Sequence, residues 1–76
     1  MKNIFSDHAK EQLVERKIPK KIVLETVKNP QKKIKSYKSR ELRQRRFGDK
    51  ILEVVIIQEE ESITIITQYW LEKEYN

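Results

Sequence analysis

The sequence has no cysteine and very little histidine, glycine or proline: one histidine, one glycine and two prolines in 76 residues. Without cysteine, the chain forms neither a disulfide framework nor a thiolate metal site. A single histidine argues against a histidine-based zinc or iron site, since those use two or three, and a single glycine excludes a glycine-rich phosphate loop. No apolar run is long enough to span a membrane, and residues 1–8 lack the apolar core of a signal peptide. We therefore expect one cytoplasmic domain over residues 1–76, with no membrane association, no metal and no cofactor.

Positive charge is concentrated in the first two thirds of the chain. The sequence holds 17 Lys+Arg and 12 Asp+Glu, which gives a formal net charge of +5. Residues 1–50 alone carry +10, whereas residues 51–76 carry −5. Such a field attracts polyanions and makes nucleic acid the leading partner, although heat-adapted proteins use similar charged surfaces without a ligand. Guanidinium groups pair with phosphate better than lysine does and favour the polyanion interpretation; four lie close together, at Arg40, Arg43, Arg45 and Arg46.

The hydrophobic periodicity changes from helical to strand-like near Pro30. Helical spacing covers residues 7–17, with Ser6 or Asp7 as the N-cap, and a second helix starts near Pro19. Alternation and apolar runs then predict strands at residues 32–38, 41–47, 51–58 and 62–71, after a short opening strand at Ile4-Phe5. The expected fold is α+β: a short N-terminal strand, then two helices packed on one face of a three- to four-stranded antiparallel sheet.

Two strands of this sheet carry side chains suited to RNA. One face of the arginine-rich strand presents Arg43 and Arg45, and one face of the last strand presents Thr67 and Tyr69. Cations on phosphates and aromatic rings on unpaired bases are the usual contacts of a sheet with RNA. The sequence does not decide which face the helices cover, so pairing these arginines with Tyr69 rather than with Trp70 is an assumption. Each aromatic taken singly is better explained by packing at the edge of the core, because small domains need their aromatics for packing.

His8 and Arg16 form a second group of interest, on the first helix. Histidine is the side chain that ordinarily titrates near neutral pH, and His8 lies in the first helical turn. Arg16 follows two turns later, about 12 Å along the helix axis, and its long side chain can share a phosphate with His8. A lone histidine near a helix start is more often a surface or capping residue, so this pair alone does not establish a site.

The order and spacing of several short motifs resemble a known family. The motifs are His8-Ala9, Glu15-Arg16, Ile18, Thr67, Tyr69, Lys73 and Tyr75. Together they are similar to a small bacterial and archaeal family of domains of unknown function that is related to the RelE/ParE-like toxin superfamily. Two residues depart from the family pattern: Lys17 stands where a glycine is frequent, and Pro19 stands where a serine is frequent. Both changes affect the junction between the helices rather than the proposed site.

The resemblance implies a RelE/ParE-like fold and a metal-independent endoribonuclease, in which a ribose 2′-hydroxyl attacks the adjacent phosphate. It implies that His8 is the general base or acid. Arg16, together with Arg43 or Arg45, would stabilise the charge of the phosphorane. The leaving group would be oriented or protonated by Tyr69, Lys73 or Tyr75. The catalytic residues expected on this basis are His8, Arg16, Tyr69 and Tyr75. The expected nucleic-acid-binding residues are Arg40, Arg43, Arg45, Arg46, Thr67 and Lys73.

The resemblance also implies partners. RNA is the expected substrate, with ribosome-associated mRNA as one candidate, and a cognate antitoxin protein is the expected regulator. Some relatives in the superfamily poison gyrase and cleave nothing, so the fold alone does not fix the chemistry. The alternative is a non-catalytic basic module that binds nucleic acid or docks on an acidic partner. The oligomeric state stays open.

Overall fold

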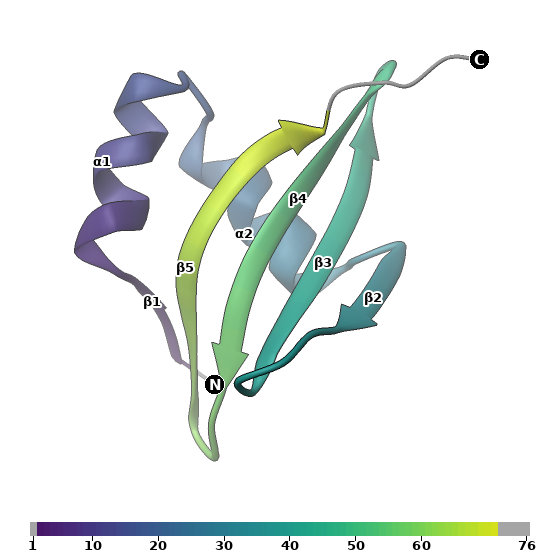
Figure 1. The fold of residues 1–76 in the computed structure, drawn as a ribbon. Coiled ribbons are helices and arrows are strands. Elements are labelled where there is room, and N and C mark those ends of the chain that lie inside the picture. Colours follow the sequence, from purple (N-terminus) through teal and green to yellow (C-terminus); the bar gives the residue numbers. More distant parts are fainter. Residues whose placement is uncertain (1, 72–76) are drawn as a thin grey trace.

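The computed structural model describes residues 2–71 and confirms the α+β class (Figure 1). The elements follow one another as β1 (Lys2–Phe5), α1 (Asp7–Glu15), α2 (Lys20–Lys28), β2 (Lys32–Lys35), β3 (Arg40–Phe47), β4 (Lys50–Gln58) and β5 (Ser62–Leu71). No helix among these residues is both long and apolar enough to cross a membrane.

All five strands belong to one sheet, in the order β1-β5-β4-β3-β2. Strands β2 to β5 form the expected antiparallel meander, and Gly48, with φ of +67°, provides the left-handed turn residue between β3 and β4. The sheet is larger and more mixed than expected, because β1 joins it as a parallel neighbour of β5. Parallel neighbours need a crossover connection, and the intervening chain, with both helices, supplies it.

Local capping sets the helix boundaries. The Ser6 hydroxyl accepts a hydrogen bond of 3.1 Å from the Ala9 amide, which caps α1 as predicted. The same hydroxyl donates to the Ile66 carbonyl at 3.1 Å and so anchors the start of α1 to β5. Helix α1 ends two residues earlier than expected because Lys17 adopts a left-handed conformation with φ of 53°. Pro19 then serves as the N-cap residue of α2.

Both helices cover the same face of the sheet. The Gln68 side-chain amide donates to the Ala9 carbonyl of α1 at 2.9 Å, and Arg43 donates to the Val27 carbonyl of α2. Gln68 and Arg43 are cross-strand neighbours of Val54 on either side of β4, so all three side chains point to one face. The core lies between this face and the helices, and its buried residues are Phe5, Ala9, Ile18, Val23, Val27, Leu52, Val54, Ile56, Ile63 and Ile65. No helix of the described chain covers the opposite face, which is turned toward the viewer in Figure 1.

Candidate functional site

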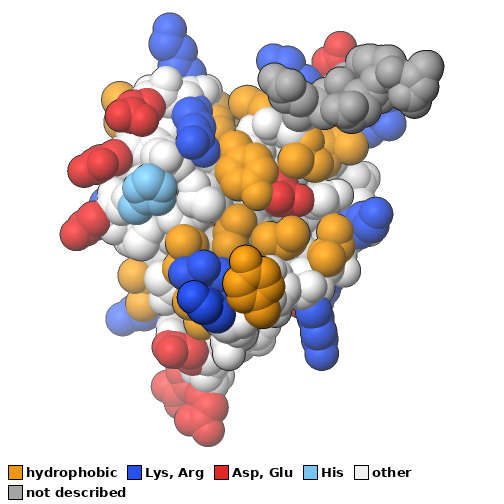
Figure 2. Space-filling model, viewed as in Figure 1, with side chains coloured by type: hydrophobic (Ala, Val, Ile, Leu, Met, Phe, Trp, Pro, Cys, Tyr) orange, Lys and Arg blue, Asp and Glu red, His pale blue; other side chains and the backbone are white. Residues whose placement is uncertain are grey.

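The uncovered side of the sheet, called the open face below, is largely apolar. Its side chains follow from the cross-strand register, since directly paired residues point the same way. Its apolar members, most of them half-buried, are Ile4, Ile34, Leu42, Ile51, Val55, Ile57 and Leu71. Figure 2 shows hydrophobic side chains gathered over the middle of this face, with an acidic and a basic group among them and the other charged groups around the rim. An apolar sheet face that no helix covers is a candidate interaction surface.

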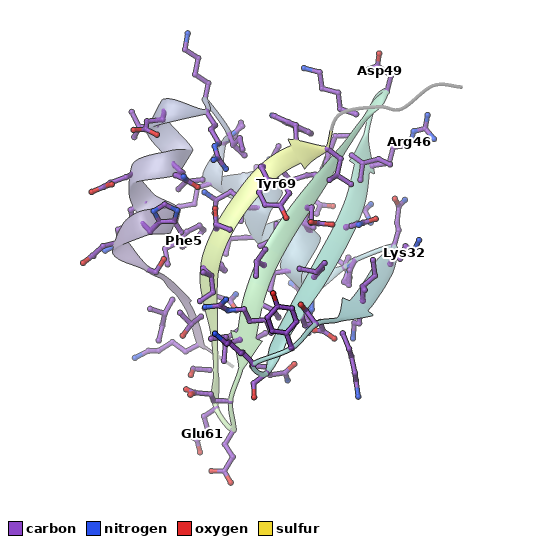
Figure 3. All side chains as sticks on the ribbon, viewed as in Figure 1. Phe5, Lys32, Arg46, Asp49, Glu61 and Tyr69 are labelled. Carbon is purple, nitrogen blue, oxygen red and sulfur yellow. The ribbon has the colours of Figure 1, made fainter. Side chains whose placement is uncertain are left out.

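A polar row crosses the open face from β5 to β3. The Tyr69 hydroxyl on β5 donates a very short hydrogen bond to one carboxylate oxygen of Glu53 on β4. The Gln44 amide on β3 donates to the other carboxylate oxygen at 2.6 Å. In Figure 3 the Tyr69 side chain lies across the sheet toward β4. Burial, reinforced by the hydrogen bond to Glu53 and the charge of that residue, raises the pKa of Tyr69 to about 12. The phenol, which is protonated at neutral pH as any tyrosine is, therefore holds its proton to higher pH and acts as a hydrogen-bond donor to Glu53.

Arg16 reaches this row from α1 because part of β5 has no strand neighbour on that side. Strand β1 pairs only with Ser62 to Ile65, so α1 flanks the rest of β5. The Arg16 guanidinium donates to the free Gln68 carbonyl at 2.9 Å and lies 5.9 Å from the centroid of the Tyr69 ring. Arg16 thus satisfies a backbone acceptor at the sheet edge and places a positive charge beside a tyrosine.

Thr67 lies in the next row of the open face, on the same side as Tyr69. Its hydroxyl donates to the side-chain oxygen of Gln12 at 2.5 Å, which ties the middle of α1 to β5. We define the Arg16–Tyr69 cluster as Arg16, Gln44, Glu53, Thr67 and Tyr69. The structure therefore brings three of the predicted site residues together, namely Arg16, Thr67 and Tyr69.

The expectation that Arg43 and Arg45 share a face with Tyr69 is wrong. Arg43 and Arg45 point to the helix-covered face, because their cross-strand partners Val54 and Leu52 are core residues. Arg43 is 7% exposed. Arg45 donates to the Asn29 carbonyl at 2.8 Å at the margin of the helix layer. These two guanidinium groups hold the sheet and α2 together, and they lie away from the Arg16–Tyr69 cluster.

Arg40 and Arg46 do lie on the open face, at its β3 margin. Both are exposed, and the Arg46 Nε donates to the Gly48 carbonyl at 3.0 Å. Lys32 of β2 pairs with Gln44 and continues the polar row, so a cation stands at each end of it: Arg16 beside β5 and Lys32 on β2. Figure 3 shows Arg46 and Lys32 at the side of the sheet opposite Tyr69.

His8 is exposed in the first turn of α1. It precedes Gln12 and Arg16 at spacings of four and eight residues, so the three lie on neighbouring parts of the helix surface that flanks β5. The two turns between His8 and Arg16 correspond to about 12 Å along the axis, and Arg16 is held at the Gln68 carbonyl. His8 is thus near the Arg16–Tyr69 cluster but outside its hydrogen-bond network. The predicted residues Lys73 and Tyr75 lie outside the described part of the chain.

Sequence reasoning missed Glu53 and Gln44, which fix the Tyr69 hydroxyl. A signal for Glu53 was present, because it is the one carboxylate within the apolar run of residues 51–57. It is 7% exposed, and a carboxylate buried to that extent needs hydrogen-bond donors. Among residues 2–71, no three histidine, aspartate or glutamate side chains come together in a group that could hold a metal ion.

The chain matches one family model over almost the whole of its described length. The match covers residues 5–70, and the family is described as "Domain of unknown function (DUF4258)". Both helices and most of the sheet, including the Arg16–Tyr69 cluster, fall within these residues. No curated protein and no solved structure gives a significant match.

Proposed function

Because the chain belongs to the DUF4258 family of domains of unknown function, we propose its function from its own geometry: the open face binds single-stranded RNA. The observation that carries the proposal is the Arg16–Tyr69 pair, a guanidinium 5.9 Å from the centroid of a ring on an uncovered sheet face. An arginine beside an aromatic ring can hold a phosphate while the adjacent base stacks on the ring.

The charge distribution around the open face supports RNA binding there, with the strand lying across the sheet. Cations lie at both lateral margins, with Arg16 beside β5 and Lys32, Arg40 and Arg46 on β2 and β3. Three strand spacings separate β5 from β2, which makes the face about 14 Å wide. A single strand lying across it would place phosphates near both margins and bases over the apolar middle.

A single strand suits the open face better than a duplex. Double-stranded RNA presents phosphates and 2′-hydroxyls and keeps its bases stacked inside, so the apolar rows around Val55 and Ile57 would gain nothing from it. Unpaired bases bury apolar surface on such rows. The formal net charge of +5 adds the general attraction to a polyanion.

A second proposal is metal-independent cleavage of the bound RNA, favoured by the Arg16 guanidinium beside the Tyr69 ring. The 2′-oxygen would form a bond to phosphorus while the bond to the 5′-oxygen breaks, which yields a 2′,3′-cyclic phosphate and a 5′-hydroxyl. Arg16 would stabilise the charge on the phosphorane, and the Tyr69 hydroxyl would turn from Glu53 to the leaving 5′-oxygen and give it the proton of the new 5′-hydroxyl. His8 would accept the proton of the 2′-hydroxyl, which requires its ring to come within hydrogen-bond reach of the phosphate that Arg16 holds, because the 2′-oxygen attacks that same phosphorus. The resemblance to RelE/ParE-like proteins supports this chemistry by analogy alone.

Binding is tested by fluorescence anisotropy with a labelled single-stranded oligouridine and a duplex of equal length. Arg46→Ala and Arg45→Ala form a matched pair, because both remove one arginine charge from β3 but from opposite faces. We expect Arg46→Ala to weaken binding and to lower the salt slope by about one, with little change for Arg45→Ala. Tyr69→Leu should weaken binding about fivefold or more, whereas Tyr69→Phe keeps the ring and should bind nearly as well as the parent protein.

Equal losses for Arg46→Ala and Arg45→Ala would refute binding on the open face, and so would tighter binding of the duplex. Cleavage is tested separately, with chelator present, on an oligonucleotide that contains one ribonucleotide. The proposal requires a 2′,3′-cyclic phosphate in the product, no cutting of the all-deoxy strand, and loss of activity in Arg16→Ala. A loss smaller than about fivefold in His8→Ala would remove His8 from the mechanism, since a positioned general base contributes about 100-fold or more.

A further inference from the structure

The strand β1 forms one edge of the sheet and leaves part of its backbone unpaired. The Lys2 amide donates to the Glu61 carbonyl at 3.1 Å, and the Ser6 amide donates to the Ile65 carbonyl at 3.0 Å. Backbone groups of alternate residues point to opposite sides of a strand, so the even-numbered residues of β1 face β5. The N–H and C=O groups of Asn3 and Phe5 therefore point outward, away from the sheet. Such an edge is a template for an added strand.

A cleft of about 630 Å³ runs along this edge. All four residues of β1 line it, together with Lys10 and Leu13 of α1 and Lys20 and Leu24 of α2. Leu13 and Leu24 are only partly buried and pack against the core, so they offer apolar contact to side chains that enter the cleft. The cleft thus combines an open strand edge with an adjacent apolar wall. That is the combination by which extended peptides are recognised, with backbone hydrogen bonds for affinity and pockets for alternate side chains.

The charge of the cleft indicates the chemistry of the peptide. Its lining residues include Lys2, Lys10 and Lys20, and no carboxylate is among them. The Lys20 Nζ lies 5.3 Å from the centroid of the Phe5 ring, so one of these cations is held over the end of β1. Three lysines around one cleft favour a ligand with carboxylates and disfavour a basic one.

We propose that this cleft binds an extended acidic peptide segment of a partner protein, which adds to the sheet as a sixth strand beside β1. Backbone groups of the peptide pair with those of Asn3 and Phe5. Apolar side chains on one face of the peptide enter the cleft toward Leu13 and Leu24, and carboxylates pair with the three lysines. The proposal does not depend on RNA binding, because the cleft shares only Lys2 and Ile4 with the open face described above and neither belongs to the Arg16–Tyr69 cluster.

The test uses a capped peptide of about nine residues that alternates valine and glutamate, titrated into the ¹⁵N-labelled protein. We expect the largest chemical-shift changes, and slower amide exchange, at Asn3 and Phe5. A peptide with lysine in place of glutamate should not bind. Asn3→Pro removes one outward donor without removing a bond to β5, and it should weaken binding strongly relative to Asn3→Ala.

The charge requirement has its own matched control. Lys2→Glu/Lys10→Glu should weaken binding about tenfold or more, whereas Lys33→Glu/Lys35→Glu, the same change on the opposite edge strand β2, should change it by less than about twofold. Should Asn3→Pro fail to fold, a peptide N-methylated at alternate amides provides the backbone test with the parent protein. Three results would overturn the proposal: equal binding by Asn3→Pro and Asn3→Ala, equal binding by the lysine peptide, or displacement of the peptide by oligouridine, which would identify RNA as the occupant.

Discussion

Arg43 is expected to be a major contributor to stability, and Arg43→Met tests this. Its guanidinium connects the sheet to the end of α2: Nη1 donates to the Val27 carbonyl, Nε to Glu41 at 2.8 Å and Nη2 to Gln58 at 3.1 Å. Methionine keeps much of the apolar stem and removes all three donors. Leaving a buried acceptor such as the Val27 carbonyl without a partner costs about 1–3 kcal/mol. Breaking a buried ion pair costs about 3–5 kcal/mol. The cost for the Arg43–Glu41 pair is lower, because the Glu41 side chain is 22% exposed and can be hydrated once Arg43 is removed.

Together these effects predict a loss of about 3 kcal/mol in the free energy of unfolding. Domains of this size have a total of roughly 4–11 kcal/mol, so the melting temperature should fall by about 12–24 °C. Urea and thermal unfolding followed by circular dichroism measure both quantities. The matched control is Arg46→Met on the exposed margin of the same strand, for which we expect a change within about 0.5 kcal/mol. A loss below about 1 kcal/mol in Arg43→Met would refute the reasoning and would make this guanidinium available to a ligand.

Three further predictions concern other contacts. The folded-state pKa of Tyr69 is raised from 10.0 to about 12, so its stabilising contribution is complete below pH 10 and is lost as the pH rises toward 12. Tyr69→Phe should abolish that loss in pH-dependent unfolding and remove a phenol with a pKa of about 12 from an ultraviolet titration. Ser6→Ala should lower stability by about 1 kcal/mol or more, because the hydroxyl both caps α1 and bonds to Ile66, and an unchanged urea midpoint would contradict this. Gln68→Met should change stability by less than about 1 kcal/mol, since the buried Gln68 Oε1 has no partner among the described residues; a loss above about 2 kcal/mol would show that its bond to Ala9 dominates.

Arg16 links the architecture of the sheet to the proposed site. Because β1 ends at Phe5, the far half of β5 needs other partners for its edge carbonyls, and Ser6 and Arg16 supply two of them. The bond to the Gln68 carbonyl also orients the guanidinium beside Tyr69. The position of the positive charge on the open face is therefore a consequence of how the sheet edge is closed.

The candidate site was predictable only in part. The spacing of Thr67 and Tyr69 placed both on one face of β5, and this is confirmed by their pairing with Val55 and Glu53. The pairing of Tyr69 with Arg43 or Arg45 was wrong. Each face of β3 carries a similar mixture of arginines and apolar residues, so the sequence pattern does not distinguish the two faces. Nothing in that alternation says that Arg43 faces the helices. The Tyr69–Glu53 contact joins two strands, and its register depends on the bulge in β5 between the partners of Val55 and Ile56.

The amino-acid order alone predicted most of the secondary structure, although the strand expected at residues 32–38 ends at Lys35, because Lys38 and Ser39 adopt positive φ. The signals are local: a serine that caps a helix, a proline near the end of one, a glycine at a left-handed turn and a two-residue alternation along strands. Only the tertiary structure decided which face of the sheet the helices cover and that β1 lies parallel to β5. The physical reason is that alternation assigns residues to two faces of a strand but does not say which face the helices bury. The choice between them is made by the total apolar area buried against the helices, and that area depends on contacts between segments far apart in the chain.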